Sequence, residues 1–124
     1  MEAAARVRAG EAYDFVALAA DALAKLEVEG HLVAGSRVGI ARSGIAVAVA
    51  QGARHRLFDR SELIHVPGIH VLGLLPAAIR SMTTFSGAIC ATAAHADAAR
   101  QWLVFAASPA TQSCKRLHGL EPAP

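Results

Sequence analysis

Residues 72–90 read Leu-Gly-Leu-Leu-Pro-Ala-Ala-Ile-Arg-Ser-Met-Thr-Thr-Phe-Ser-Gly-Ala-Ile-Cys, and they hold two apolar segments on either side of a proline. The first segment, residues 69–74, follows the turn signal Pro67-Gly68 and ends before Pro76, which predicts a short strand. The second, residues 82–92, alternates imperfectly between apolar and polar side chains and also favours a strand. Two strands are therefore expected to follow one another here.

Two helices are predicted after these strands. Residues 94–107 carry apolar side chains at helical spacing, so Trp102 and Phe105 are expected to pack on a sheet. Ser108 and Pro109 are residue types preferred at the N-cap and at the first position of a further helix, and Gly119 would end that helix.

The N-terminal part continues the alternation of strand and helix. Residues 38–50 predict a long strand, with a Ser-Gly pair in its middle that permits a bend or bulge. Residues 13–18 form a β-rich run, residues 21–29 a helix closed by glycine, and residues 2–8 a short Ala-rich helix. The alternation predicts an α/β fold in which helices flank a layered mixed sheet, within a single domain over residues 1–124.

Composition narrows the classes of partner. A chain of 124 residues with 54% hydrophobic residues buries one modest core, because much of that percentage is alanine. The net charge of +2 is too small to indicate a nucleic-acid partner or an anionic membrane surface. The apolar stretches are too short for a transmembrane helix. The basic run around Arg54, Arg56 and Arg60 is read as a solvated loop, and Cys90 and Cys114 as two reduced thiols.

Several blocks of the chain resemble, in the same order, the molybdate-type solute-binding proteins of ABC transporters, which are type II periplasmic binding proteins. The blocks are Arg8–Glu11 with Asp14–Leu18, Leu26–Val38, Ala41–Val49, Ser61–Leu63 with Val66–Ile69, and Leu72–Pro122. The resemblance implies a first-lobe-like part at residues 1–52, a junction at 53–60 and a returning C-terminal part at 61–124. It also implies that the opening strand and most of the second lobe are missing.

The same resemblance implies where a ligand would bind. The family holds an oxyanion in the cleft between its lobes, through hydroxyls and backbone N–H groups that replace the hydration shell of the anion. The corresponding residues here are Ser43, Thr83, Thr84, Phe85 and Ser86. Phe85 stands where the family often has tyrosine, so one hydroxyl donor is lost. The site is therefore expected to be incomplete, and the alternative is that these hydroxyls face solvent or a partner.

Other chemistry finds little support in the sequence. His65 and His70 flank a turn near Glu62 and could approach zinc, but a zinc site needs three or four ligands in fixed geometry. Ser43 lacks the Gly-x-Ser-x-Gly spacing of a nucleophile elbow, and no phosphate loop or dinucleotide motif is present. We therefore predict no catalytic residue, no metal site and no cofactor, and do not expect an enzyme.

Two functions follow as expectations. The first is a solute-binding domain related to oxyanion transport, with an ABC permease as partner only if the missing parts are supplied elsewhere. The second is a small self-associating interaction protein, a homodimer that forms where Asp14 to Leu18 or a neighbouring strand is left with an unpaired edge. Such a dimer could also exchange the strand at residues 38–50 over a hinge at Arg54 to Arg60. The resemblance implies a periplasmic location, whereas the lack of a signal peptide in the chain as given implies the cytoplasm.

Overall fold

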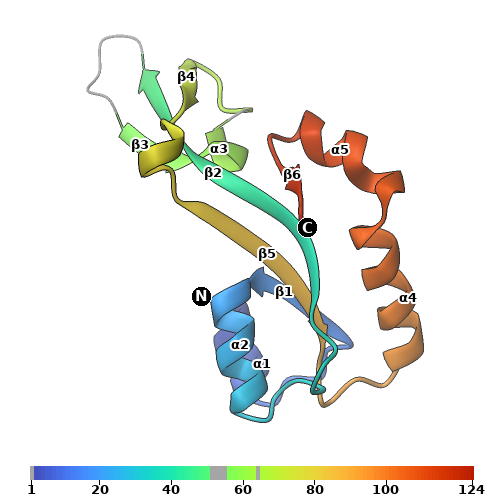
Figure 1. The fold of residues 1–124 in the computed structure, drawn as a ribbon. Helices are drawn as coiled ribbons and strands as arrows, with labels where there is room; N and C mark the ends of the chain where they lie inside the picture. Colours follow the sequence, from blue (N-terminus) through green and yellow to red (C-terminus); the bar gives the residue numbers. More distant parts are fainter. Residues whose placement is uncertain (1, 51–55, 64) are drawn as a thin grey trace.

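The computed structural model describes residues 2–50, 56–63 and 65–124, and two long strands run through it from end to end (Figure 1). In chain order the elements are α1 (Glu2–Arg8), β1 (Phe15–Ala19), α2 (Ala20–Val28), β2 (Val38–Ala50), β3 (Arg56–Asp59), α3 (Arg60–Leu63), β4 (Ile69–Leu74), the 3-10 turn η1 (Ala77–Ile79), β5 (Met82–Ile89), α4 (Ala96–Ala107), the 3-10 turn η2 (Pro109–Thr111), α5 (Gln112–Leu117) and β6 (Glu121–Pro122). The long strands are β2 and β5. No helix among these described residues has the length and apolarity needed to cross a membrane.

The larger half of the molecule is built on the strand order β1-β5-β2, with β6 beyond β2. Phe15 to Ala19 pair with Ile89 to Phe85, and the first half of β2 pairs with the same strand on its other side. The α/β class with flanking helices is confirmed, but every registered strand pair is antiparallel, whereas a mixed sheet was predicted. The reason is that β5 lies between β1 and β2, runs opposite to both, and so keeps these two from forming a parallel ladder.

The smaller half surrounds the second half of β2. Residues 45–50 of this strand pair with β3 on one side and β4 on the other, and α3 connects the two (Figure 1). Buried Ala46 and Ala48 pack there against partly buried side chains of β4. Of the predicted junction at 53–60, residues 56–60 form β3 and the start of α3, while residues 53–55 lie outside the described part.

A narrow connection joins the halves. In the described part of the chain, Ser43 and Gly44 of β2 have strand pairing only with Thr83 and Met82 of β5, and we call these four residues the waist. The register shifts of β2 lie at 39/41 and 47/48 and not at the Ser-Gly pair, which was expected to permit a bend or bulge. Gly44 has another role, since a Cβ there would lie 3.1 Å from Leu74 Cδ2 and from Met82 Sδ.

Alternate residues of the strands in the larger half contribute side chains to two core layers, one on each face of the sheet. Val16, Ala88 and Cys90 face α1 and α2, where Leu23 and Leu26 are fully buried. Neighbouring positions, among them Phe15 and Ile89, face α4 on the other side. This alternation is the period-two pattern of a strand covered on both faces. Cys90 is buried, Cys114 is exposed, and both are free thiols.

Helix α4 packs on the sheet through a different set of side chains from the one expected. Its buried residues are Ala99, Leu103 and Ala106, and Leu103 sits over Gly87, where a Cβ would overlap Leu103 Cδ2. Phe105 is 57% exposed, so the prediction that it packs on the sheet is wrong. Trp102 is 45% exposed and reaches the sheet only by stacking on Phe15, with 4.5 Å between ring centroids. The helical period places 102 and 105 beside the buried stripe rather than within it.

This assignment predicts opposite outcomes for two truncations in the same helix. Leu103→Ala removes a side chain that is 1% exposed and should cost about 2–5 kcal/mol of unfolding free energy. Phe105→Ala should cost under about 1 kcal/mol, instead of the about 3–5 kcal/mol of a buried phenylalanine. Urea unfolding of both variants measures the difference. Equal losses would show that Phe105 is part of the core.

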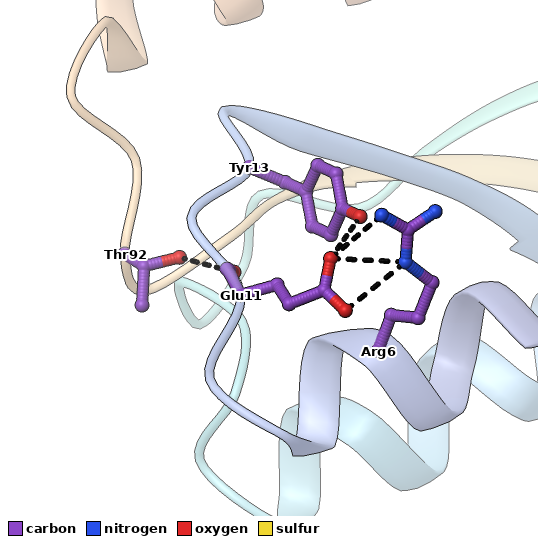
Figure 2. Close-up of polar contacts among 4 residues, drawn as sticks. All are labelled: Arg6, Glu11, Tyr13 and Thr92. Carbon is purple, nitrogen blue, oxygen red and sulfur yellow. Dashed lines mark hydrogen bonds and ion pairs between the residues drawn. The ribbon is translucent and has the colours of Figure 1, made fainter.

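A polar network fixes the connection between α1 and β1 (Figure 2). The Arg6 guanidinium donates from Nε to Glu11 Oε2 at 2.9 Å, and the Tyr13 hydroxyl donates to the same oxygen at 2.6 Å. The Thr92 hydroxyl donates to the Glu11 backbone carbonyl at 3.4 Å. The pKa of the Glu11 carboxyl lies below its ordinary value because Arg6, and then Tyr13, donate hydrogen bonds to the ionised form.

The lowered pKa of Glu11 determines how acidification changes the stability of the protein. Its contribution to stability is present above the ordinary glutamate pKa of about 4.3 and is lost as pH falls through the lower folded-state value. Glu11→Gln should therefore flatten the fall in melting temperature on acidification below about pH 4.3. Tyr13→Phe, which removes one donor and leaves Arg6, should flatten it less. An unchanged acid limb in Glu11→Gln would contradict the network's role.

Candidate functional site

A hollow of about 330 Å³ lies beside the waist, where β5 begins and α2 begins. Its lining consists of Ala19, Ala20, Asp21, Met82, Thr83 and Thr84. Two of the predicted ligand-binding residues, Thr83 and Thr84, therefore share one hollow. A threonine hydroxyl can donate one hydrogen bond to a bound group. Because consecutive strand residues point to opposite faces of the sheet, the two hydroxyls are not aimed at the same side.

The start of α2 supplies a second type of hydrogen-bond donor, its backbone N–H groups. A helix leaves its first N–H groups without intrahelical partners, and its N-terminal end carries partial positive charge. The N-cap position is Ala19, which has no side chain able to cap these groups. The sequence folds this way locally because β1 runs directly into α2 with no intervening loop. The hollow thus combines hydroxyls with backbone donors, whereas Asp21 in the first turn brings a negative charge.

Arg42 is a residue that the sequence reasoning did not include in the site. In the sheet it is registered directly opposite Thr84, so the two side chains lie on the same face. Arg42 Nη2 lies 3.5 Å from Glu121 Oε2, and Arg42 Nε is buried with no hydrogen-bond partner among the described residues. A signal was available, because an arginine in the middle of a long apolar strand is unusual and needs a counter-charge or a ligand.

The other predicted site residues lie apart from the hollow. Ser43 pairs with Thr83 across the waist but is 1% exposed and already has an interaction within the protein. Ser86 is buried, and Phe85 pairs with Ala19 and Ala41 within the sheet. Of the five predicted residues, only Thr83 and Thr84 reach the lining of this hollow.

His65, one of the two histidines considered and set aside as zinc ligands, contacts His118. His65 Nε2 lies 3.1 Å from His118 Nδ1, so the smaller half touches the C-cap of α5. Within the described residues, no group of three or more His, Cys, Asp or Glu side chains could hold a metal ion. The side chain of Glu62 belongs to the part that is not described.

A second, larger hollow of about 480 Å³ lies between α1 and β1. Its walls come from α1, through Glu2, Ala3, Arg6 and Val7, and from Tyr13, Phe15, Val16 and Ala17. It shares no lining residue with the hollow beside the waist. The Arg6–Glu11–Tyr13 network of Figure 2 stands at its end.

Comparison with known proteins gives the same family as the sequence blocks. The model of the family described as bacterial extracellular solute-binding protein matches residues 1–59 and 57–121. Among curated proteins, an aconitate isomerase from a Pseudomonas species is 33% identical over 101 residues. The match covers 81% of this chain, and the chain spans 38% of the relative's length.

A solved structure has the same fold. The substrate binding domain of a putative molybdenum ABC transporter from Clostridium difficile superposes with a TM-score of 0.81 at 11% sequence identity. The superposition covers 99% of this chain and 82% of that chain. The two family matches cover almost all of the sequence, and the chain belongs to the bacterial extracellular solute-binding protein family.

Proposed function

We propose that this chain is a solute-binding domain that holds an oxygen-bearing anion, weakly, in the hollow beside the waist. The observation that carries the proposal is the meeting of Thr83 and Thr84 with the N-terminus of α2 in one hollow. Aimed neutral donors stabilise an anion without burying a counter-charge. Arg42 lies on the same sheet face as Thr84; Glu121 offsets part of its charge, and its buried Nε has no hydrogen-bond partner among the described residues.

The class of ligand is supported by the relatives. One is named for molybdenum transport and one for aconitate, and molybdate and aconitate are both anions that present oxygen atoms. A tetrahedral oxyanion or a carboxylate would accept hydrogen bonds from the same hydroxyl and N–H donors. A permease partner belongs to the same proposal, because the solved relative is part of an ABC transporter.

The arrangement supports binding rather than chemical conversion. Hydroxyls and backbone N–H groups hold an anion, and a proton transfer would need a base placed against the substrate. The titratable group in the lining is Asp21, which lies in the first turn of α2. Its carboxylate repels an anion at the same position, and the position of Phe85 offers no hydroxyl. These features favour an affinity of about millimolar or weaker, near 4 kcal/mol of binding free energy.

Titration followed by NMR chemical shifts tests this proposal. Molybdate, sulfate and aconitate are added separately, and shifts should concentrate at residues 19–21 and 82–84 with a Kd of about 1 mM or above. Thr84→Val should weaken binding about tenfold, because a hydrogen bond to a charged group is lost. The isosteric control Thr92→Val, at an exposed site elsewhere, should not change it.

Three outcomes would count against the proposal. Micromolar affinity would show a complete site, and shifts confined to other surfaces would place the ligand elsewhere. Conversion of aconitate in the same sample would show an enzyme. Each is read from the same spectra.

A charge change in the hollow gives a second test. Asp21→Asn removes the carboxylate from the lining and should raise anion affinity several-fold, more at low ionic strength than at high. Asp97→Asn is the matched control, since Asp97 also lies in the first turn of a helix, α4, away from the hollow. If both substitutions raise affinity equally, the effect is one of net charge and the hollow is not the site.

A further inference from the structure

The smaller half of the molecule contacts α5 through a pair of histidines. Nε2 of His65, which follows α3, lies 3.1 Å from Nδ1 of His118, the C-cap of α5. The two rings meet edge to face, with 5.1 Å between their centroids. Helix α5 otherwise packs on β6 and η2, and it has no comparable packing against α3, β3 or β4 among the described residues. In the described part of the chain, the histidine pair is therefore the contact that ties the smaller half to this helix.

This contact depends on an unprotonated ring nitrogen. A neutral imidazole has one nitrogen that donates and one that accepts, whereas a protonated imidazole donates from both. The pair can therefore keep its hydrogen bond as long as one of the two rings is neutral. When both rings are protonated, two N–H groups face each other and two positive charges lie side by side, so the rings repel each other.

The surroundings of the pair do not compensate for this repulsion. Both histidines are exposed, so protons reach them from solvent. Within the described residues neither ring has an ion pair with a carboxylate, and Glu121 of β6 lies against Arg42. The other titratable or charged groups on the elements next to the pair are Cys114, Lys115 and Arg116 on α5, Arg60 and Glu62 on α3, and His70 on β4. Cations outnumber carboxylates in this set, which makes it harder to charge both rings while they stay together.

We propose that His65 and His118 form a pH-sensitive latch, which fixes the orientation of the smaller half at neutral pH and releases it in acid. Imidazole side chains change charge between about pH 5 and 8, so the release falls in that range. It changes the structure because the strand pairing that connects the halves in the described residues consists of the waist alone. Once the latch is open, the smaller half takes up a range of orientations.

A second histidine contact responds to acid in the opposite direction. Within the larger half, His95 Nδ1 lies 3.2 Å from Asp14 Oδ2, and the His95 backbone N–H donates to Asp14 Oδ1 at 2.8 Å. The pKa of the Asp14 carboxyl lies below its ordinary value, first because of this backbone hydrogen bond, so the carboxylate persists when His95 gains a proton. A cation then faces a carboxylate, which strengthens the contact. Acid therefore loosens the contact between the halves while this contact of the larger half is kept.

Distances between spin labels on the two halves test the proposal in the full chain. The labels are attached at Leu72→Cys on β4 and Val104→Cys on α4, where the native side chains are 63% and 61% exposed. Cys114→Ser removes the exposed thiol, and Cys90 is buried. Pulsed electron paramagnetic resonance should give one narrow distance distribution at about pH 7.5 and a broad one at about pH 5. Far-ultraviolet circular dichroism at both pH values checks that the fold is retained.

Two substitutions of the same histidine should have opposite effects. His118→Ala removes the contact, so the distance distribution should be broad at both pH values. His118→Asn places an amide, which donates and accepts without gaining a proton, where Nδ1 of the ring lies, so the distribution should stay narrow at both. The controls are His95→Gln, at an exposed histidine of the larger half, and Lys115→Met, at a buried amine whose pKa is lowered by desolvation. Both controls should respond to pH as the wild type does.

Several results would overturn the latch. One is a wild-type distribution that is the same at both pH values, and another is a pH response that persists in His118→Ala. Loss of the response in Lys115→Met or His95→Gln, with the response intact in His118→Asn, would assign the pH dependence to that other residue.

Discussion

The antiparallel pairing of β2 with β5 is the constraint on which the rest of this structure depends. Strand β5 contributes side chains to both core layers of the larger half, β2 contributes Val38 and Ile40 to the layer under α4, and the smaller half is built on the continuation of β2. The close approach of Leu103 to Gly87 of β5 fixes α4 against the same ladder. The candidate ligand hollow lies beside the start of β5, at one end of this ladder. A substitution that disturbs this ladder therefore affects both the fold and the candidate site.

The sequence indicates the elements more reliably than their environments. The strands at 38–50 and 69–74 and the helix at 2–8 have the predicted bounds, because turn residues and apolar runs are local signals. Two features depend on distant parts of the chain and were missed. The insertion of β5 between β1 and β2 is decided by long-range pairing, and the burial of Leu103 rather than Phe105 is decided by which stripe of α4 meets the sheet.

The candidate site shows the same difference between what local sequence signals indicate and what long-range pairing decides. The resemblance to solute-binding proteins pointed to Thr83 and Thr84, and these residues do line a hollow. It could not show that Ser43 is buried in the waist, nor that residues 19–21 at the start of α2 line the same hollow as the threonines, because both facts depend on long-range strand pairing. Arg42 was missed for the same reason, since only the register places it across from Thr84.

The waist also has a mechanical consequence. A ladder two strands wide bends and twists more readily than the wider sheets on either side of it, so it is the softest part of the connection between the halves. The contact between His65 and His118 is exposed and holds the halves together at a second point with little force. Small rotations of one half about Ser43 and Gly44 would change the angle between the two halves. A ligand that contacted residues on both sides of the waist would restrict this rotation, and the two halves would then move as one rigid unit.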